Sequence, residues 1–220
     1  MMRDALIVFV KEARPGAVKT RLAGAIGDHA AAEAYRALAE AEIRATAPPS
    51  AAPGTPAYER LFYFAPAEAH AAVVAWLTPV AGDEPLVCFP QAGADLGVRM
   101  AQAFAECFAR GARRVAIVGT DVPACSQRHV LAALGALDDH DVVLGPTHDG
   151  GYYLLALSRE QPELFRDIAW STPAVLQVTL ERAAALGLRV EQIETLRDVD
   201  TLADWQEHGL RLAGGAGEHG

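Results

Sequence analysis

The stretch ALIVFVKEARPGAVKTRL, residues 5–22, joins an apolar run directly to a loop rich in cations. Residues 5–10 are uninterrupted apolar side chains, several of them branched, which is typical of a strand buried on both faces. The loop that follows carries four cations around one glycine, in a chain of net charge −9: Lys11, Arg14, Gly16, Lys19 and Arg21. The stretch therefore predicts a buried strand that brings a basic loop to one edge of a sheet.

This loop has the composition of a phosphate site. Backbone amides flanked by Lys and Arg suit the oxygens of a pyrophosphate. Gly16 lets the backbone approach a ligand closely, and Pro15 restricts the turn. The GxxxxGK[ST] pattern of a Walker loop is absent from the sequence. We predict that residues 11–22 bind a diphosphate; a solvated basic loop is the alternative.

Strand-length apolar runs alternate with helical stretches along the rest of the chain. Strands are expected at residues 5–10, 60–64, 86–89, 114–118, 141–144, 152–157 and 189–193. Helices are expected at residues 28–44, capped by Asp28, and at 66–77, 96–111, 127–137, 173–186 and 202–212. Residues 46–58 carry four prolines and are expected to form a loop. Such alternation predicts an α/β fold, a mostly parallel sheet with helices on both faces.

Composition limits the classes of protein that fit this chain. Its 220 residues, 51% of them apolar, suit one domain over residues 1–212 with a glycine-rich tail at 213–220. The longest apolar runs are too short to span a membrane, and we expect a cytoplasmic protein. The net charge of −9 argues against a nucleic-acid partner. Three cysteines without metal-ligand spacing fit a reducing compartment, with Cys88 and Cys107 buried in the core.

Two carboxylates follow predicted strands, where open α/β sheets bind their ligands. Asp121 comes directly after the strand at 114–118, where it could hold a divalent cation that bridges two phosphates. A structural role in the turn before Pro123 is the alternative. Asp149 follows the strand at 141–144 and could act as a base or bind sugar hydroxyls, although it could also stabilise its turn.

Six motifs in order resemble a family of small bacterial GT-A-type glycosyltransferases, catalogued as a domain of unknown function. They are FVKEARPGAVKTRL at 9–22, QAGADLGVRM at 91–100, GTDVP at 119–123, GPTHDGGYY at 145–153, WSTP at 170–173 and DVDTLAD at 198–204. The resemblance covers nearly the whole chain and implies the nucleotide-diphospho-sugar transferase (GT-A) fold. It also implies that Asp121 is a metal-binding acid. Many such enzymes carry two acids spaced by one residue, whereas here the first position is Gly119.

The missing first acid requires a second ligand for Mg²⁺ or Mn²⁺ from elsewhere in the chain. Asp198 and Asp200 lie two residues apart, so in an extended segment both point to the same side. Related nucleotidyltransferases complete their metal site with a late acid, and the resemblance assigns that position to Asp200. Asp204 fits a helix-capping pattern with Thr201, which favours a structural role.

The remaining candidates surround the donor sugar and the acceptor. Asp95 is either an N-cap or a nucleotide ligand, and Arg99 is a candidate for a phosphate or a carboxylate. His148, Gly150 and Gly151 are candidates for the sugar or acceptor. Trp170 either stacks on a sugar or belongs to the core, and Ser171 either lines the site or caps a helix.

Three functions fit these motifs. The first is metal-assisted transfer of a sugar from a nucleotide diphosphate sugar to an acceptor hydroxyl, with Asp149 as the base. The second is nucleotidyl transfer from a nucleoside triphosphate to a phosphorylated small molecule, since the chain also resembles phospholactate guanylyltransferases. The third is a non-catalytic nucleotide-sensing domain. A homodimer also remains open.

Overall fold

A computed structural model describes residues 3–52, 55–82 and 85–207. The predicted tail at 213–220 and the end of the last predicted helix, beyond residue 207, lie outside these residues. Within them, no helix is both long and apolar enough to cross a bilayer.

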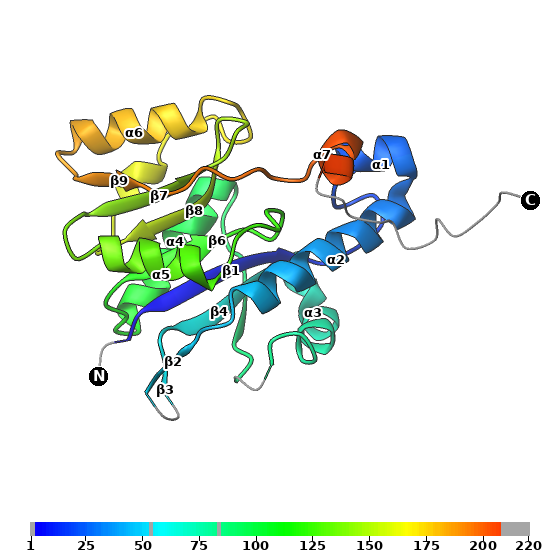
Figure 1. The fold of residues 1–220 in the computed structure, drawn as a ribbon, viewed down its shortest axis with the longest axis horizontal. Coiled ribbons are helices and arrows are strands. Elements are labelled where there is room, and N and C mark those ends of the chain that lie inside the picture. The colour runs from blue at the N-terminus through cyan, green and yellow to red at the C-terminus, as the bar shows by residue number, and fades with distance from the viewer. Residues whose placement is uncertain (1–2, 53–54, 83–84, 208–220) are drawn as a thin grey trace, which may run out of the picture.

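Seven strands form one sheet, as the sequence predicts (Figure 1). They are β1 (Ala5–Lys11), β4 (Glu59–Ala65), β5 (Cys88–Pro90), β6 (Val115–Val118), β7 (Val142–Pro146), β8 (Tyr152–Leu157) and β9 (Val190–Gln192). Their order across the sheet is β5-β4-β1-β6-β8-β7-β9. Strand β8 runs antiparallel to β6 and β7, and the other pairs are parallel. The prediction of a mostly parallel mixed sheet is therefore confirmed.

Helices cover both faces of this sheet (Figure 1). Helices α2 (Asp28–Ala45), α3 (His70–Leu77) and α5 (Gln127–Ala136) contribute to the core on one face, where Leu6, Val8 and Val10 point. Helices α4 (Leu96–Ala109) and α6 (Val175–Ala185) contribute to the core on the other face, with Ala5 and Ile7. Alternate residues of β1 thus enter opposite cores, which is why its sequence is apolar throughout.

A third, smaller core joins helices α1 and α2 to the C-terminal segment of the described chain. Helix α1 (Thr20–Ile26) contributes Leu22, and α2 contributes Leu38. Val199 and Trp205, the latter on α7 (Leu202–Glu207), pack against them. Figure 1 shows α7 lying beside α1, far along the chain from it. This packing places the segment around Asp200 over the N-terminal basic loop.

Several sequence predictions about element boundaries are wrong. The basic loop ends in helix α1, so the chain is already helical at Thr20. The N-cap of α2 is Gly27 rather than Asp28, because α1 continues to Ile26 and leaves Gly27, at φ 86°, as the junction. Within the predicted loop 46–58, β2 (Ser50–Ala52) and β3 (Thr55–Pro56) form a hairpin. A two-stranded hairpin is all edge, where proline is tolerated.

One prediction about buried side chains also needs correction. Cys88 is only partly buried, since it lies on β5 at the edge of the sheet. Cys107 is buried, as predicted.

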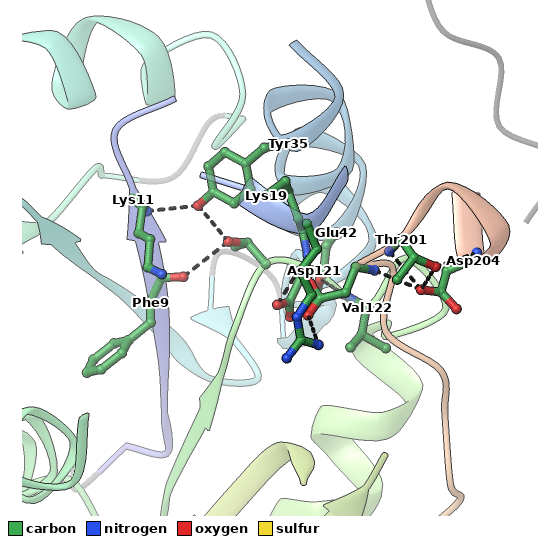
Figure 2. A network of polar contacts seen from close by, with 12 residues as sticks. Phe9, Lys11, Lys19, Tyr35, Glu42, Asp121, Val122, Thr201 and Asp204 are labelled. Atoms are coloured by element: carbon green, nitrogen blue, oxygen red, sulfur yellow. Dashed lines mark hydrogen bonds and ion pairs between the residues drawn. The ribbon is translucent and has the colours of Figure 1, made fainter. Parts of the chain in front are cut away.

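A chain of hydrogen bonds ties the carboxyl ends of β1 and β6 to helix α2 (Figure 2). The backbone N–H of Lys11 donates to the hydroxyl of Tyr35 at 2.8 Å. That hydroxyl lies 3.0 Å from Thr120 Oγ1, which itself donates to the carbonyl of Phe9 at 3.2 Å. Tyr35 is buried, and burial raises its pKa to about 12, so the hydroxyl remains protonated. The network fixes both loops that emerge from these strands.

We predict that Tyr35→Phe lowers the free energy of unfolding by about 1–3 kcal/mol. The N–H of Lys11 and the hydroxyl of Thr120 would each lose a hydrogen bond to Tyr35. Urea unfolding measures the change. Tyr153→Phe is the matched control, since its hydroxyl donates a partly buried hydrogen bond to the carbonyl of Glu194. We expect the control to cost about 1 kcal/mol. A Tyr35→Phe protein as stable as the wild type would contradict this role.

A second prediction concerns Gly150, which lies between β7 and β8 at φ 91°. A Cβ there would collide with the carbonyl of Pro173. Gly150→Ala should therefore lower the free energy of unfolding by at least about 2 kcal/mol, from overpacking and backbone strain. Gly135, in α5, has open space around its Cα, so Gly135→Ala should stabilise by up to about 1 kcal/mol. Equal stability of the two variants in urea would show that position 150 does not require glycine.

Candidate active site

A pocket of about 630 Å³ opens at the carboxyl ends of the central strands. Ten of the predicted site residues line it: Lys11, Lys19, Arg21, Arg99, Asp121, Asp149, Gly151, Trp170, Ser171 and Asp200. Tyr35 and Asp198 line it as well. The rule that α/β sheets bind ligands beyond the carboxyl ends of their strands thus locates the pocket correctly.

Lys19 is the buried cation of the pocket. Its Nζ lies 2.8 Å from Asp200 Oδ1 and 3.4 Å from Asp121 Oδ2, and its side chain is only 5% exposed. Figure 2 shows Lys19 and Asp121 pointing toward one another. The residue occupies the N-cap of α1 in a left-handed conformation, with φ 46°. Arg21 reaches the other oxygen of Asp200 at 3.7 Å, with its side chain largely exposed.

Asp200 reaches Lys19 because the C-terminal segment is fastened at several points. The N–H of Val199 donates to the carbonyl of Asp121 at 3.0 Å. One oxygen of Asp204 accepts hydrogen bonds from the N–H and the hydroxyl of Thr201 and from the N–H of Asp200. The structural role predicted for Asp204 is therefore confirmed, and its effect is to hold the turn that carries Asp200 (Figure 2).

Burial and charge oppose each other in this cluster. Burial lowers the pKa of Lys19, but the carboxylates of Asp121 and Asp200 together raise it by more than burial lowers it, so the net change is upward. The ammonium therefore stays charged. Burial, and then the charges of Asp149, Asp200 and Asp121, raise the pKa of Asp198 to about 6. Four carboxylates thus share one pocket with a single buried lysine.

Glu42 is a buried acid that the sequence analysis did not identify as part of the site. It lies on α2, is 1% exposed, and its Oε2 accepts the N–H of Val122 at 3.0 Å. Burial, and then the nearby charge of Asp121, raise its pKa well above the usual value. The bond holds the backbone next to Asp121. The available signal was an acid at a position where the helical period of α2 requires an apolar residue.

Asp149 stabilises a turn at the edge of the pocket. Its Oδ1 accepts the hydroxyl of Thr147 at 2.6 Å and the N–H of Gly151 at 3.0 Å, so it stabilises its own turn. The residue also lines the pocket. The turn therefore fixes the carboxylate in the pocket wall.

The start of α4 and the segment before α6 also contribute to the pocket lining. Asp95 is the N-cap of α4, accepting the N–H of Val98 at 2.9 Å, and it does not line the pocket. Arg99 does line it, with its Nε donating to the carbonyl of Gly93 at 3.0 Å. Trp170 packs so closely on Gly97 that a Cβ there would lie 2.6 Å from the indole nitrogen. Ser171 caps no helix, because α6 begins after Ala174.

The other predicted residues are not among those that line the pocket. Arg14 and Gly16 belong to the exposed part of the basic loop, where Arg14 pairs with Glu12 at 4.0 Å. His148 and Gly150 lie in the turn after β7. Gly150 is required by its contact with Pro173, so the close approach is to the chain's own backbone.

Few described side chains are placed to act as ligands for a divalent cation. No three His, Cys, Asp or Glu side chains within the described residues are grouped closely enough to hold a metal ion. Asp121 and Asp200 flank one position, which the Lys19 ammonium occupies. Proteins nevertheless often bind Mg²⁺ through only one or two carboxylates, with substrate phosphates as its other ligands.

Comparisons with known proteins agree with this arrangement. A family model described as an uncharacterized protein conserved in bacteria, DUF2064, matches residues 50–172. A crystal structure from Desulfovibrio desulfuricans G20, described provisionally as a nucleotide-diphospho-sugar transferase, is 32% identical with a TM-score of 0.82. The alignment covers 93% of this chain and 85% of that one. A sequence search of curated proteins finds no match.

More distant structures share the fold. The 4-diphosphocytidyl-2C-methyl-D-erythritol synthase of Anaerococcus prevotii has a TM-score of 0.56 at 8% identity, covering 92% of this chain and 94% of that one. Glucosyl-3-phosphoglycerate synthase of Mycobacterium tuberculosis, solved with Mg²⁺ and UDP, has a TM-score of 0.53 at 11% identity, covering 90% and 70%. The chain belongs to the DUF2064 family and has the fold of the nucleotide-diphospho-sugar transferases.

Proposed function

We propose that this protein transfers a sugar from a nucleotide diphosphate sugar to the hydroxyl of a small acceptor, assisted by Mg²⁺ or Mn²⁺. The observation that carries the proposal is the cluster of Lys19, Asp121 and Asp200 at the carboxyl edge of the sheet. It combines a buried cation for phosphate oxygens with two carboxylates for a divalent ion. The 32% identical relative supports a transferase of this class.

The basic residues of the loop would neutralise the diphosphate. Lys11, Lys19 and Arg21 all line the pocket and come from a single segment of chain. Cations at this position stabilise the negative charge that grows on the leaving diphosphate as the bond to the sugar breaks. Asp121 and Asp200 would hold a divalent cation, which would supply further positive charge to stabilise the same leaving group.

Asp149 would serve the acceptor. In an inverting transfer, the acceptor oxygen attacks the anomeric carbon, the bond to the diphosphate breaks, and the nucleoside diphosphate leaves. A carboxylate takes the proton that the acceptor hydroxyl loses. Asp149 lies in the pocket wall, held through one oxygen by Thr147 and Gly151. Trp170 and Ser171 would border the sugar or acceptor, and Arg99 would bind an anionic group.

Nucleotidyl transfer is the second candidate, because the synthase of a diphosphocytidyl compound shares the fold. The same clamp would then hold a triphosphate, a phosphorylated acceptor would attack its α-phosphorus, and pyrophosphate would leave. The released product separates the two reactions.

We predict that nucleotide sugars incubated with the protein and Mn²⁺ release free nucleoside diphosphate, with water as a poor acceptor. Chromatography of a panel that varies the base and the sugar would identify the donor. Release of pyrophosphate from nucleoside triphosphates, without any cleavage of nucleotide sugars, would refute sugar transfer and support nucleotidyl transfer.

We also predict that Asp121→Asn and Asp200→Asn each weaken Mn²⁺-dependent nucleotide binding by at least about tenfold, because each removes a charge adjacent to the cation. Calorimetry with the best nucleotide of a thermal-shift screen measures the change. Asp95→Asn is the matched control: it removes an acid outside the pocket and keeps a good N-cap, so binding should be unchanged. Wild-type affinity in both pocket variants would refute the metal assignment.

A further inference from the structure

Lys19 occupies the position that the proposed function gives to the divalent cation. Its ammonium is 2.8 Å from one carboxylate and 3.4 Å from the other. A divalent ion needs contacts of about 2.0–2.6 Å to the same oxygens. Two cations cannot share this space, because they would clash sterically and repel each other strongly.

The lysine is built into this position by the fold. Its backbone begins α1, its carbonyl accepts the N–H of Ala23 at 2.8 Å, and the next turn is anchored by the fully buried Leu22. The side chain is 5% exposed, in contrast to the neighbouring Arg21 at 72%. Only the flexible four-carbon stem of Lys19 could carry the ammonium elsewhere without unfolding α1.

We infer, on the basis of the proposed function, that Lys19 is an internal counter-ion that closes the carboxylate pair in the nucleotide-free protein. The metal ion then enters together with the nucleotide rather than before it. The diphosphate offers the ammonium new oxygen partners, so Lys19 moves onto the phosphates and leaves Asp121 and Asp200 to the metal. Nucleotide and metal therefore bind with positive coupling, and linkage makes that coupling reciprocal.

The charges around the pocket explain why such a counter-ion is useful. Asp121, Asp149, Asp198 and Asp200 would repel one another in an empty pocket, and they would attract free metal ions without any substrate. Lys19 removes part of that repulsion. A site that discriminates against free metal binds the metal–nucleotide complex without first trapping an ion in an unproductive state.

Mn²⁺ alone, with no nucleotide, is the direct probe. Electron paramagnetic resonance of free Mn²⁺ gives its affinity for the wild type and for variants. Lys19→Met keeps the length of the side chain but removes the charge, and should bind Mn²⁺ at least about tenfold more tightly than the wild type. Lys19→Gly serves as a second variant, because glycine suits the left-handed backbone at this position. It should also bind Mn²⁺ more tightly than the wild type.

Arg21→Met is the matched control. It removes a charge that contacts the same Asp200, but from an exposed position outside the space between the carboxylates. We expect it to raise Mn²⁺ affinity by less than about threefold, because solvent screens exposed pairs. Equal gains in the Lys19 and Arg21 variants would reduce the effect to general electrostatics and overturn the inference.

Thermal melting tests the exchange with phosphate. In the wild type, Mn²⁺ and inorganic pyrophosphate together should raise the melting temperature by more than the sum of their separate effects. In Lys19→Met, Mn²⁺ alone should produce most of the increase. The same melts and circular dichroism verify that the variants are folded.

The double variant Lys19→Met/Asp121→Asn separates this inference from the proposed function. If the gain of Lys19→Met is lost in the double variant, the metal lies on the carboxylate pair. If Lys19→Met binds Mn²⁺ no more tightly than the wild type while Asp121→Asn weakens binding, the metal site stands and the counter-ion role fails. If Asp121→Asn has no effect in either background, the metal assignment fails, and the inference fails with it.

Discussion

The ion pair of Lys19 with Asp121 and Asp200 is the contact on which the organisation of this site depends. It joins the loop after β1, the loop after β6 and the C-terminal segment, and the residues are 102 and 181 positions apart in the sequence. Lys19 is buried, and a buried charge is costly unless it is paired, so its contacts with the two partly exposed carboxylates hold the three segments together. The small core of Leu22, Leu38, Val199 and Trp205 brings them together from the apolar side.

Helix α2 supports the same site through two polar side chains. Tyr35 ties the ends of β1 and β6 together, and Glu42, further along the helix, holds the backbone beside Asp121. Both side chains are buried, and each forms a hydrogen bond with the backbone of a loop that borders the pocket. The helix therefore acts as a scaffold for the loops that carry charge, in the manner of outer residues that orient a binding site.

Much of the fold was predictable because each central strand is a continuous apolar run. Helix-covered strands such as β1 contribute to two cores, which leaves a clear pattern in the sequence. Predictions failed where local signals were weak or shared. Helix α1 is only seven residues long and follows the left-handed Lys19, and the hairpin of β2 and β3 lies in a proline-rich segment. Gly27 became an N-cap because two helices meet there.

The sequence by itself determined the class of the fold, the edge of the sheet at which the pocket opens, and ten of the residues that line the pocket. Those conclusions rest on periodicity and on residues next to strand ends, which are local properties of the chain. Only the tertiary structure decided which charges meet. It paired Lys19 with Asp121 and Asp200, made Glu42 a support for the backbone beside Asp121, and assigned Gly150 to a contact with Pro173. These pairings join segments distant in sequence, and their geometry depends on how helices and loops pack, which no local pattern records.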